Sequence, residues 1–476
     1  PLNNPIRSAW NESRKLSYSL FKRTIDMEKR MKRTSAKTLE TARQAGYLGK
    51  KMLMNAQQAQ EEGRPTAWSM VTWWQGELIA RAMGIEVVFP ENYGAFCAAV
   101  GAAEAHLEIS ESEGFPGTLC GYARNCFGYA KRLADNNFVP PKDAPGGGMA
   151  NPVLLISSGT ACDARYKWFQ ALGRYLENAP VWTLELPMPG TCEFFLPDYK
   201  KFSIKFIVEH LKEYVAFLEN LLGKKMDYDC LSENVDQALK TLRIAYDVDQ
   251  LRKAVPAPMV AQDFWAVMIA HLFLSNDPEA YAFYQKVYGE VKYKVDNKIG
   301  AIPNEKYRMM FFEIPPWHSL GFFDSLAESF GVAMAMESWS YHTMVPIPEE
   351  DLVGVTDPLE MIARLSFRKW TEFNDVALEY DLDPGMFMGA AVQYAKDYQI
   401  DGLFCHPLMS CRPATYSLLQ MKNVLEEKLK IPGVLVEGDI VDFRVFNEEE
   451  AYSKVEAFLE TMDHYRELRG NGGSAS

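Results

Sequence analysis

The stretch Val153-Leu-Leu-Ile-Ser-Ser-Gly-Thr-Ala-Cys-Asp-Ala-Arg-Tyr-Lys-Trp168 decides the fold of this chain. It starts as an apolar run long enough for a buried strand, breaks at residues 157–160, and continues with helical periodicity through Trp168. Cys162 therefore falls where a strand ends and a helix begins. This edge is a common binding site in open α/β sheets, and the positive end of a helix dipole there favours an anion such as a thiolate.

A second strand at residues 181–186 completes a βαβ unit. The pattern recurs at residues 401–437, where a helix at 412–429 again lies between two strands. Cys411 has the same place in this second unit as Cys162 has in the first. The two units predict two similar α/β domains.

We therefore expect an α/β protein with two parallel-sheet domains of the Rossmann or flavodoxin type that face a central cleft. Helical periodicity prevails at residues 10–62 and from about 199 to 298. The expected division is a helical N-terminal arm at 1–64, a first α/β domain at 65–198, a helical segment at 199–300 and a second α/β domain at 301–476. Shorter patterns predict strands at 67–72 and 85–89, helices at 77–83 and 121–133, and a loop at 139–148.

Composition and charge exclude several classes of protein. The chain is 48% hydrophobic and 24% charged, which is typical of a globular protein with a large core. No apolar stretch reaches transmembrane length and residues 1–10 lack a signal-peptide core, so we expect a cytoplasmic protein without a membrane partner. The formal net charge of −13 argues against nucleic acid as a partner. Residues 1–64 carry 14 Lys/Arg and 6 Asp/Glu, a basic arm that is either a solvated helical face or a grip for an acidic partner.

Three of the eight cysteines are candidate metal ligands. Without an export signal, disulfides are not expected, and no CxxC motif is present. Cys120 opens a helical pattern, so that Cys120, Cys162 and Cys411 each stand at a helix start. Three thiolates of this kind suit an iron–sulfur cluster with one open iron, or a partly open metal site. Each cysteine could also be a small buried hydrophobe.

The order of several short motifs resembles a known family. They are Pro90-Glu91-Asn92, Cys120-Gly-Tyr-Ala-Arg124, Cys162 with Lys167-Trp168, Asp401-Gly402, Ser410-Cys411-Arg412 and Glu437-Gly-Asp-Ile-Val-Asp442. Over residues 60 to 462 the chain resembles a subunit of the 2-hydroxyacyl-CoA dehydratase and class I benzoyl-CoA reductase family. The resemblance implies two α/β domains with a [4Fe-4S] cluster between them, held here by Cys120, Cys162 and Cys411.

The resemblance also implies partners and a reaction class. Family subunits pair with a related cluster-bearing second subunit, and a separate homodimeric iron–sulfur ATPase supplies one electron at very low potential. The substrate is an acyl-CoA thioester and the chemistry is of the ketyl radical type. Some relatives carry further cysteines where this chain has Leu107 and Ala164, and Cys126 and Cys405 are reserve ligands.

Aromatic residues predict a substrate pocket. Where dehydratases of the family have small hydroxyl residues after the first strand, this chain has Thr72-Trp73-Trp74, and further tryptophans stand at Trp317 and Trp339. An aromatic pocket would suit an aryl ring and exclude water from a radical intermediate, although core packing explains the same residues. The candidate acid–base residues are Glu91, His318, His342 and Glu77, each of which could instead form an ordinary polar contact.

The leading hypothesis is the [4Fe-4S]-bearing subunit of an ATP-activated enzyme that reduces benzoyl-CoA or another aryl-CoA. The alternative hypothesis is the α-like subunit of a 2-hydroxyacyl-CoA dehydratase. A third hypothesis is a non-catalytic electron-relay subunit, whose cluster would be fully ligated and would have no substrate pocket.

Overall fold

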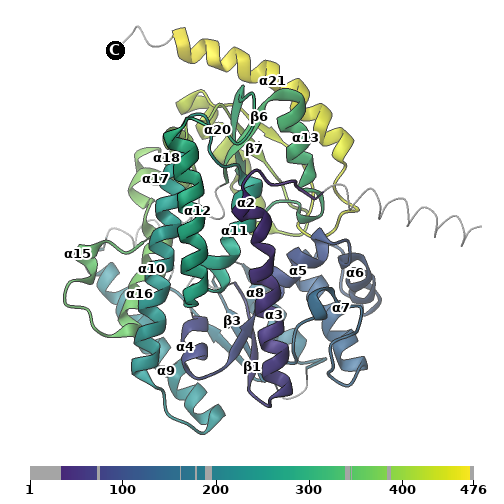
Figure 1. Cartoon of the computed structure of the whole chain (residues 1–476), viewed down its shortest axis with the longest axis vertical. Coiled ribbons are helices and arrows are strands. Elements are labelled where there is room, and N and C mark those ends of the chain that lie inside the picture. The colour runs from purple at the N-terminus through teal and green to yellow at the C-terminus, as the bar shows by residue number, and fades with distance from the viewer. Residues whose placement is uncertain are drawn as a thin grey trace, which may run out of the picture.

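The computed structural model describes residues 34–71, 76–160, 162–176, 179–187, 196–337, 344, 346–382 and 388–471. Within these residues the chain forms two four-stranded sheets whose strand pairs are all parallel. In Figure 1 the sheets lie one above the other along the long axis of the molecule, with helices around both. The expected α/β fold with two parallel sheets is confirmed.

The first sheet has the strand order β2-β1-β3-β4. Its strands are β1 (Thr66–Ser69), β2 (Glu86–Val88), β3 (Leu154–Ser158) and β4 (Val181–Leu184). The nearby helices are α4 (Gly76–Ala82), α5 (Pro90–Ala99), α6 (Ala103–Ser112), α7 (Gly121–Asp135) and α8 (Asp163–Leu172). Every residue of β1 and β3 is buried, as expected for central parallel strands that helices cover on both faces.

The second sheet has the order β6-β5-β7-β8. Its strands are β5 (Tyr307–Phe312), β6 (Val332–Glu337), β7 (Gly402–Cys405) and β8 (Gly433–Leu435). The nearby helices are α13 (Gly321–Phe330), α18 (Met388–Asp397), α19 (Arg412–Tyr416), α20 (Leu418–Leu429) and α21 (Glu448–Asn471). Numbered within its own sheet, each sheet has the order 2-1-3-4 with which a flavodoxin-like sheet begins. Such a sheet has its binding crevice at the carboxyl ends of its first and third strands.

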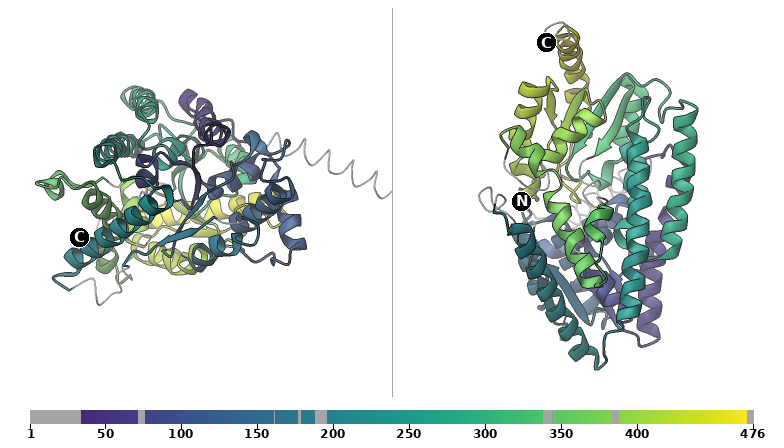
Figure 2. Two further views of the ribbon diagram at one scale, coloured as in Figure 1. Left: turned by 90° about the horizontal axis from the view of Figure 1, so that it is seen from below. Right: turned by 90° about the vertical axis from the view of Figure 1, so that its left-hand side faces the viewer.

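A helical segment joins the two sheets. It consists of α9 (Tyr199–Leu222), α10 (Tyr228–Arg252), α11 (Ala261–Phe273) and α12 (Pro278–Asp296). The long helices α10 and α12 pack together and run along one side of the molecule past both sheets (Figures 1 and 2). We call the first sheet with its nearby helices the first half of the molecule, and the second sheet with its nearby helices the second half. Helix α10 contacts α4 of the first half, and its last residue, Arg252, donates to Glu337 of β6 at 2.8 Å. One continuous helix therefore fixes the two sheets relative to each other.

The remaining described elements flank this framework. They are α2 (Glu40–Gln44), α3 (Gly46–Glu61), η1 (Pro145–Gly147), η3 (Trp317–Ser319), α15 (Glu349–Leu352), α16 (Pro358–Thr371) and α17 (Asn374–Glu379). Helix α3 buries Leu48, Met52 and Leu53, so this part of the arm belongs to the core. The predicted helices before residue 34, and the basic run at residues 29–33, lie outside the described residues.

The sequence prediction of one helix at residues 412–429 is wrong, because the structure has two helices that meet at Ser417. Within the short first helix, the hydroxyl of Thr415 donates to the carbonyl oxygen of Cys411 and accepts the N–H of Leu408. These side-chain bonds tie α19 to the loop before it. The predicted strands at 67–72 and 433–437 are correct in place but end earlier, at Ser69 and Leu435.

A buried arginine links the two halves next to the crevice. The Arg124 side chain of α7 is fully buried and donates to Asp442 Oδ2 of the second half at 3.2 Å. It also donates to the Leu119 carbonyl oxygen at 3.0 Å and to Glu111 Oε1 at 3.1 Å. Arg444 completes the network by pairing with both Asp442 and Glu111.

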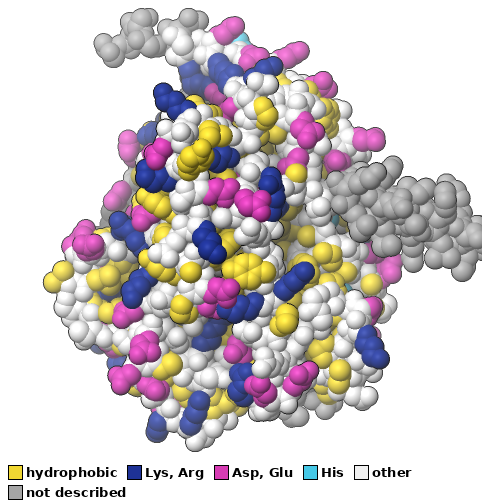
Figure 3. All heavy atoms as spheres, viewed as in Figure 1, with side chains coloured by type: hydrophobic (Ala, Val, Ile, Leu, Met, Phe, Trp, Pro, Cys, Tyr) yellow, Lys and Arg dark blue, Asp and Glu magenta, His cyan; other side chains and the backbone are white. Residues whose placement is uncertain are grey.

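Two surface properties follow from the described residues. None of their helices is long and apolar enough to cross a bilayer. On the face shown in Figure 3, Lys/Arg and Asp/Glu side chains are interspersed rather than gathered by sign. That face therefore offers no extended patch of a single charge.

Replacing Arg124 tests the link between the halves. We expect Arg124→Ala to lower the free energy of unfolding by about 3 kcal/mol, because it leaves the buried Asp442 with Arg444 alone. Urea denaturation followed by circular dichroism measures the change. The control is Lys131→Ala in the same helix, whose partner Asp135 is exposed, and we expect an effect within about 0.5 kcal/mol. Equal effects of the two substitutions would contradict the assigned role of Arg124.

Candidate functional site

A cavity lies where the carboxyl ends of the two sheets face each other. Its empty volume, including the opening, is about 890 Å³. The first half contributes residues that follow β1, β2 and β3, and the second half contributes residues that follow β5 and β7. The cavity therefore lies at the expected crevice of both sheets at once.

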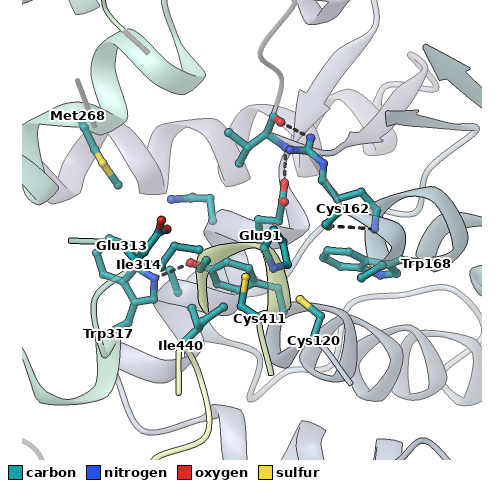
Figure 4. Close-up of a pocket in the computed structure, with 18 of the residues that line it drawn as sticks. Glu91, Cys120, Cys162, Trp168, Met268, Glu313, Ile314, Trp317, Cys411 and Ile440 are labelled. Atoms are coloured by element: carbon teal, nitrogen blue, oxygen red, sulfur yellow. Dashed lines mark hydrogen bonds between the residues drawn. The ribbon is translucent and has the colours of Figure 1, made fainter. Parts of the chain in front are cut away.

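The three cysteines that the sequence singles out all line this cavity. Cys120 is the N-cap residue of α7, Cys162 of α8 and Cys411 of α19. Figure 4 shows the sulfur atoms of Cys120 and Cys411 next to each other, with Cys162 beside Trp168 on the same side of the cavity. The fold thus brings together three residues that are separated by 42 and 249 positions in the sequence.

Burial and neighbouring charge act on all three thiols. Burial raises the pKa of Cys120 to about 12, and it also raises the pKa values of Cys162 and Cys411. Each helix start opposes this rise in pKa with backbone N–H groups, as where Arg165 N donates to Cys162 Sγ at 3.4 Å. A negative charge on Cys120 or Cys162 would further raise the pKa of Cys411. The three groups are therefore neutral thiols unless a cation is bound.

Three cysteine thiols are a donor set that an iron–sulfur cluster uses. Among the described residues, no group of three or more His, Cys, Asp or Glu side chains is placed to hold one metal ion. In a [4Fe-4S] cluster each thiolate binds a different iron, so the sulfur atoms stand farther apart than around one ion. Three cysteines would leave one iron open. The reserve candidates Cys126 and Cys405 are fully buried elsewhere and do not line the cavity.

The same three cysteines also line a second, outer cavity of about 790 Å³. Exposed Met409 and the ion pair between Arg412 and Asp163 lie at this outer cavity. The pair joins the residues next to Cys411 and Cys162, so it connects the two halves over the sulfur atoms. The thiols therefore separate an inner apolar space from an outer one near the surface.

Glu91 lines the inner cavity from the first turn of α5. Its Oε2 accepts the N–H of Val71, and Arg165 donates to the carbonyl oxygen of Val71. Burial raises the pKa of Glu91, while the charge of Arg165 and the Val71 N–H act against this rise in pKa. Glu91 is thus a half-buried residue of the cavity wall with a cation close by.

Much of the remaining wall is apolar and aromatic. Trp168, Ile314 and Trp317 line the cavity, together with Met268, Phe273 and Ile440. Trp317 Nε1 donates to the hydroxyl of Tyr122 at 2.5 Å, which joins the two halves across the cavity. Such a wall excludes water and suits an acyl or aryl group.

Two other candidates from the sequence, His318 and Glu77, lie elsewhere. His318 does not line the cavity, and its ring bonds Ser319 Oγ at 3.0 Å and the carbonyl oxygen of Asp439 at 3.1 Å. Glu77 is buried in α4 near Lys369, where burial lowers the pKa of Lys369 to about 8 and the charge of Glu77 opposes this change. Trp73, Trp74, Trp339 and His342 lie outside the described residues. The roles of all six residues stay predictions.

Sequence reasoning missed four polar residues of the cavity, Asn92, Tyr122, Arg165 and Glu313. Tyr122 and Arg165 stand two and three residues after a cysteine at a helix start, which places them in the first turn of the helix. Glu313 follows the buried strand β5 directly. A polar residue directly after an apolar strand was therefore the signal that could have found Glu313.

Comparison with known proteins identifies relatives over most of the chain. A family model described as "2-hydroxyglutaryl-CoA dehydratase, D-component" matches residues 75–462. The chain is 25% identical to the (R)-2-hydroxyisocaproyl-CoA dehydratase alpha subunit of Clostridioides difficile over 416 residues, or 87% of this chain and 94% of that subunit.

Two other relatives have similar coverage. The lactoyl-CoA dehydratase alpha subunit of Anaerotignum propionicum is 22% identical over 427 residues, which are 88% of this chain and 95% of that subunit. A benzoyl-CoA reductase subunit of Thauera aromatica is 25% identical over 367 residues, which are 75% of this chain and 79% of that subunit. Most of the relatives found are alpha subunits of dehydratases.

Cysteine replacement tests which thiols hold the cluster. We expect Cys162→Ala to abolish the iron and sulfide content of protein purified without oxygen, because two thiolates would remain at the cavity. Cys126→Ala and Cys405→Ala are matched controls, since both cysteines are buried away from the cavity, and both should keep the full iron content. Full iron in Cys162→Ala would remove Cys162 from the ligand set.

Proposed function

The chain belongs to the 2-hydroxyglutaryl-CoA dehydratase D-component family, and from this premise we propose that it is the α-like, cluster-bearing subunit of a 2-hydroxyacyl-CoA dehydratase. The family includes subunits of 2-hydroxyacyl-CoA dehydratases and of benzoyl-CoA reductases. The comparisons favour the dehydratase hypothesis over the reductase that the tryptophans suggested. The observation that carries the proposal is one apolar cavity lined by three helix-capping cysteines and the half-buried Glu91.

The proposed cofactor is a [4Fe-4S] cluster held by Cys120, Cys162 and Cys411. When bound, it would supply a low-potential electron and an open iron that attracts a substrate oxygen. The chain provides the surroundings of this centre. Backbone N–H groups at three helix starts would stabilise the negative charge of the thiolates. The apolar side chains of Ile314 and Trp317 in the cavity wall would exclude water.

The inner cavity would hold the acyl part of the thioester. Dehydration of a 2-hydroxyacyl group removes the hydroxyl from C2 and a proton from C3. Glu91 is the proposed base, because its carboxyl lines the cavity and Arg165 favours its charged form. The contact of Glu91 with the Val71 N–H fixes the direction of the carboxyl.

Partner proteins are part of the proposal. The relatives are named as subunits, so we propose that this chain pairs with a related second subunit. We also propose a separate ATP-hydrolysing iron–sulfur activator as the electron donor. The outer cavity offers a short route from the surface to the three sulfur atoms.

A reductase is the second candidate function. The benzoyl-CoA reductase relative and the aromatic lining by Tyr122, Trp168 and Trp317 favour an aryl-CoA substrate. A pure electron relay is less well supported, since it requires no cavity beside its cluster. The inner cavity therefore favours a catalytic subunit.

A substrate comparison tests the proposal. The complex of this chain with its second subunit, reduced by the activator and ATP, is supplied with lactoyl-CoA, 2-hydroxyisocaproyl-CoA and benzoyl-CoA. We expect conversion of at least one 2-hydroxyacyl-CoA to the enoyl-CoA and no loss of benzoyl-CoA, as followed by liquid chromatography and mass spectrometry. Consumption of benzoyl-CoA alone would establish the reductase. No turnover, with cluster spectra that do not respond to any thioester, would establish the relay.

Replacement of Glu91 tests the proposed base. We expect Glu91→Gln to lower kcat about 10²-fold to 10⁴-fold at unchanged iron content, because the amide keeps the shape of the side chain but accepts no proton. Glu86→Gln is the matched control, because Glu86 stands at the opposite end of the preceding strand, away from the cavity. Kinetics of Glu91→Gln equal to those of the control would exclude Glu91 as the base.

A further inference from the structure

Glu313 is a second carboxyl in the inner cavity. It follows β5 directly and is 2% exposed. Figure 4 shows Glu313 and Trp317 on the side of the cavity opposite Cys162 and Trp168, with Glu91 between the two sides. Two carboxyls therefore line this cavity, one at its Trp317 side and one between its two sides.

The two carboxyls have different surroundings. Glu91 accepts the Val71 N–H and lies near Arg165. No hydrogen-bond donor among the described residues reaches the buried Oε1 of Glu313. A buried carboxyl without a donor or a counter-ion keeps its proton.

Other buried carboxyls of this protein, unlike Glu313 Oε1, have ion-pair or hydrogen-bond partners. Asp442 is paired with Arg124, Glu337 with Arg252, and Asp263 accepts N–H groups at residues 38 and 39. Burial alone raises the pKa of Glu313 to about 8. The carboxylic acid form therefore prevails at neutral pH.

The backbone at Glu313 is strained. Its φ is +89°, a region that side chains rarely adopt and that glycine favours. Strain of this kind persists where the surrounding structure holds a residue in place, and it is concentrated at functional sites. Here the strained residue is one that lines the cavity.

We propose that Glu313 is the proton donor of this site and gives its proton to the oxygen that leaves a 2-hydroxyacyl thioester as water. This inference rests on the proposed dehydratase function. The C2–O bond breaks and the oxygen takes the Glu313 proton, while the C3–H bond breaks, its proton passes to Glu91 and the C2–C3 double bond forms. Glu91 then releases its proton to solvent and Glu313 takes one up.

The electrons balance as well. One electron from the low-potential iron–sulfur donor enters the thioester and leaves it again when the enoyl product forms. The conversion therefore has no net redox change. Hydroxide is a poor leaving group, and a proton delivered as the C2–O bond breaks lets it depart as water.

The other titratable groups that line the cavity are less suited to this step. Arg165 bonds the Val71 carbonyl oxygen, and an arginine keeps its proton in proteins. The Tyr122 hydroxyl accepts the Trp317 N–H, and burial raises the pKa of Tyr122. Glu91 has a nearby cation, and the three cysteines are the proposed cluster ligands. Glu313 is the acid that remains.

Glu313→Gln in the activated complex tests the inference with two substrates. Glutamine has the same shape but no proton of suitable acidity, so we expect kcat with a 2-hydroxyacyl-CoA to fall about 100-fold or more, with KM within about 3-fold. Iron and sulfide content should be unchanged. The matching 2-chloroacyl-CoA loses chloride, which needs no proton, so Glu313→Gln should convert it within about 3-fold of the wild-type rate.

Glu328→Gln is the matched control, because Glu328 is exposed on α13, which follows the same strand, and does not line the cavity. It should convert both substrates at wild-type rates. Glu313→Asp keeps a carboxylic acid, so its loss should be at least about tenfold smaller than that of glutamine. If Glu313→Gln loses iron, Glu313→Asp takes its place in the comparison of the hydroxy and chloro substrates.

The outcomes separate the two proposals. An equal loss with the hydroxy and chloro substrates would mean a structural role and would overturn the inference, as would unchanged turnover of the 2-hydroxyacyl-CoA. In both cases an active wild-type enzyme leaves the dehydratase function standing. A wild-type complex that converts no 2-hydroxyacyl-CoA would overturn the proposed function and this inference with it.

Discussion

Parallel strands present their carboxyl ends at one edge of a sheet, and in this protein two such edges face each other. The cavity depends on this arrangement. Cys162 follows β3, Glu313 follows β5 and Cys411 comes after β7, so residues far apart in sequence reach one space. Helix α10 and the buried Arg124 hold the two edges together. A change in their relative position would separate the three sulfur atoms.

The electrostatics of the cavity favour a bound cation. Three thiols and two carboxyls line it, and Arg165 is the one basic side chain among its described lining residues. Burial raises the pKa of each of these acidic groups, and Arg165 opposes this rise at Glu91. Protons on the thiols and on Glu313 therefore compensate for the missing positive charge. Iron would displace the protons from the thiols. The carboxyls would remain available to transfer protons to and from the substrate. The proposed roles follow from these two kinds of acid. The sulfur atoms would bind the cluster, and the glutamates would transfer protons.

Much of the fold could be predicted from the sequence, because buried parallel strands are apolar runs and the helices between them are periodic. The position of Cys162 between a strand and a helix is an example that the structure confirms. The apolar runs that form β5 and β6 were not recognised as strands, and the end of α19 and start of α20 on either side of Ser417 interrupt a pattern that predicts one helix. For the site, spacing could not show that Cys120 meets the other two cysteines. It also could not show that no donor among the described residues reaches Glu313 Oε1, because both facts depend on contacts between residues far apart in the sequence.

The central claim is that Cys120, Cys162 and Cys411 bind one iron–sulfur cluster between the two sheets. Anomalous X-ray diffraction at the iron absorption edge, from crystals grown without oxygen, tests this claim most directly. The account predicts a single compact group of about four iron sites, three of them within bonding distance of these three sulfur atoms. Iron bound elsewhere in the chain, or three sulfur atoms in the refined structure with no iron between them, would contradict it.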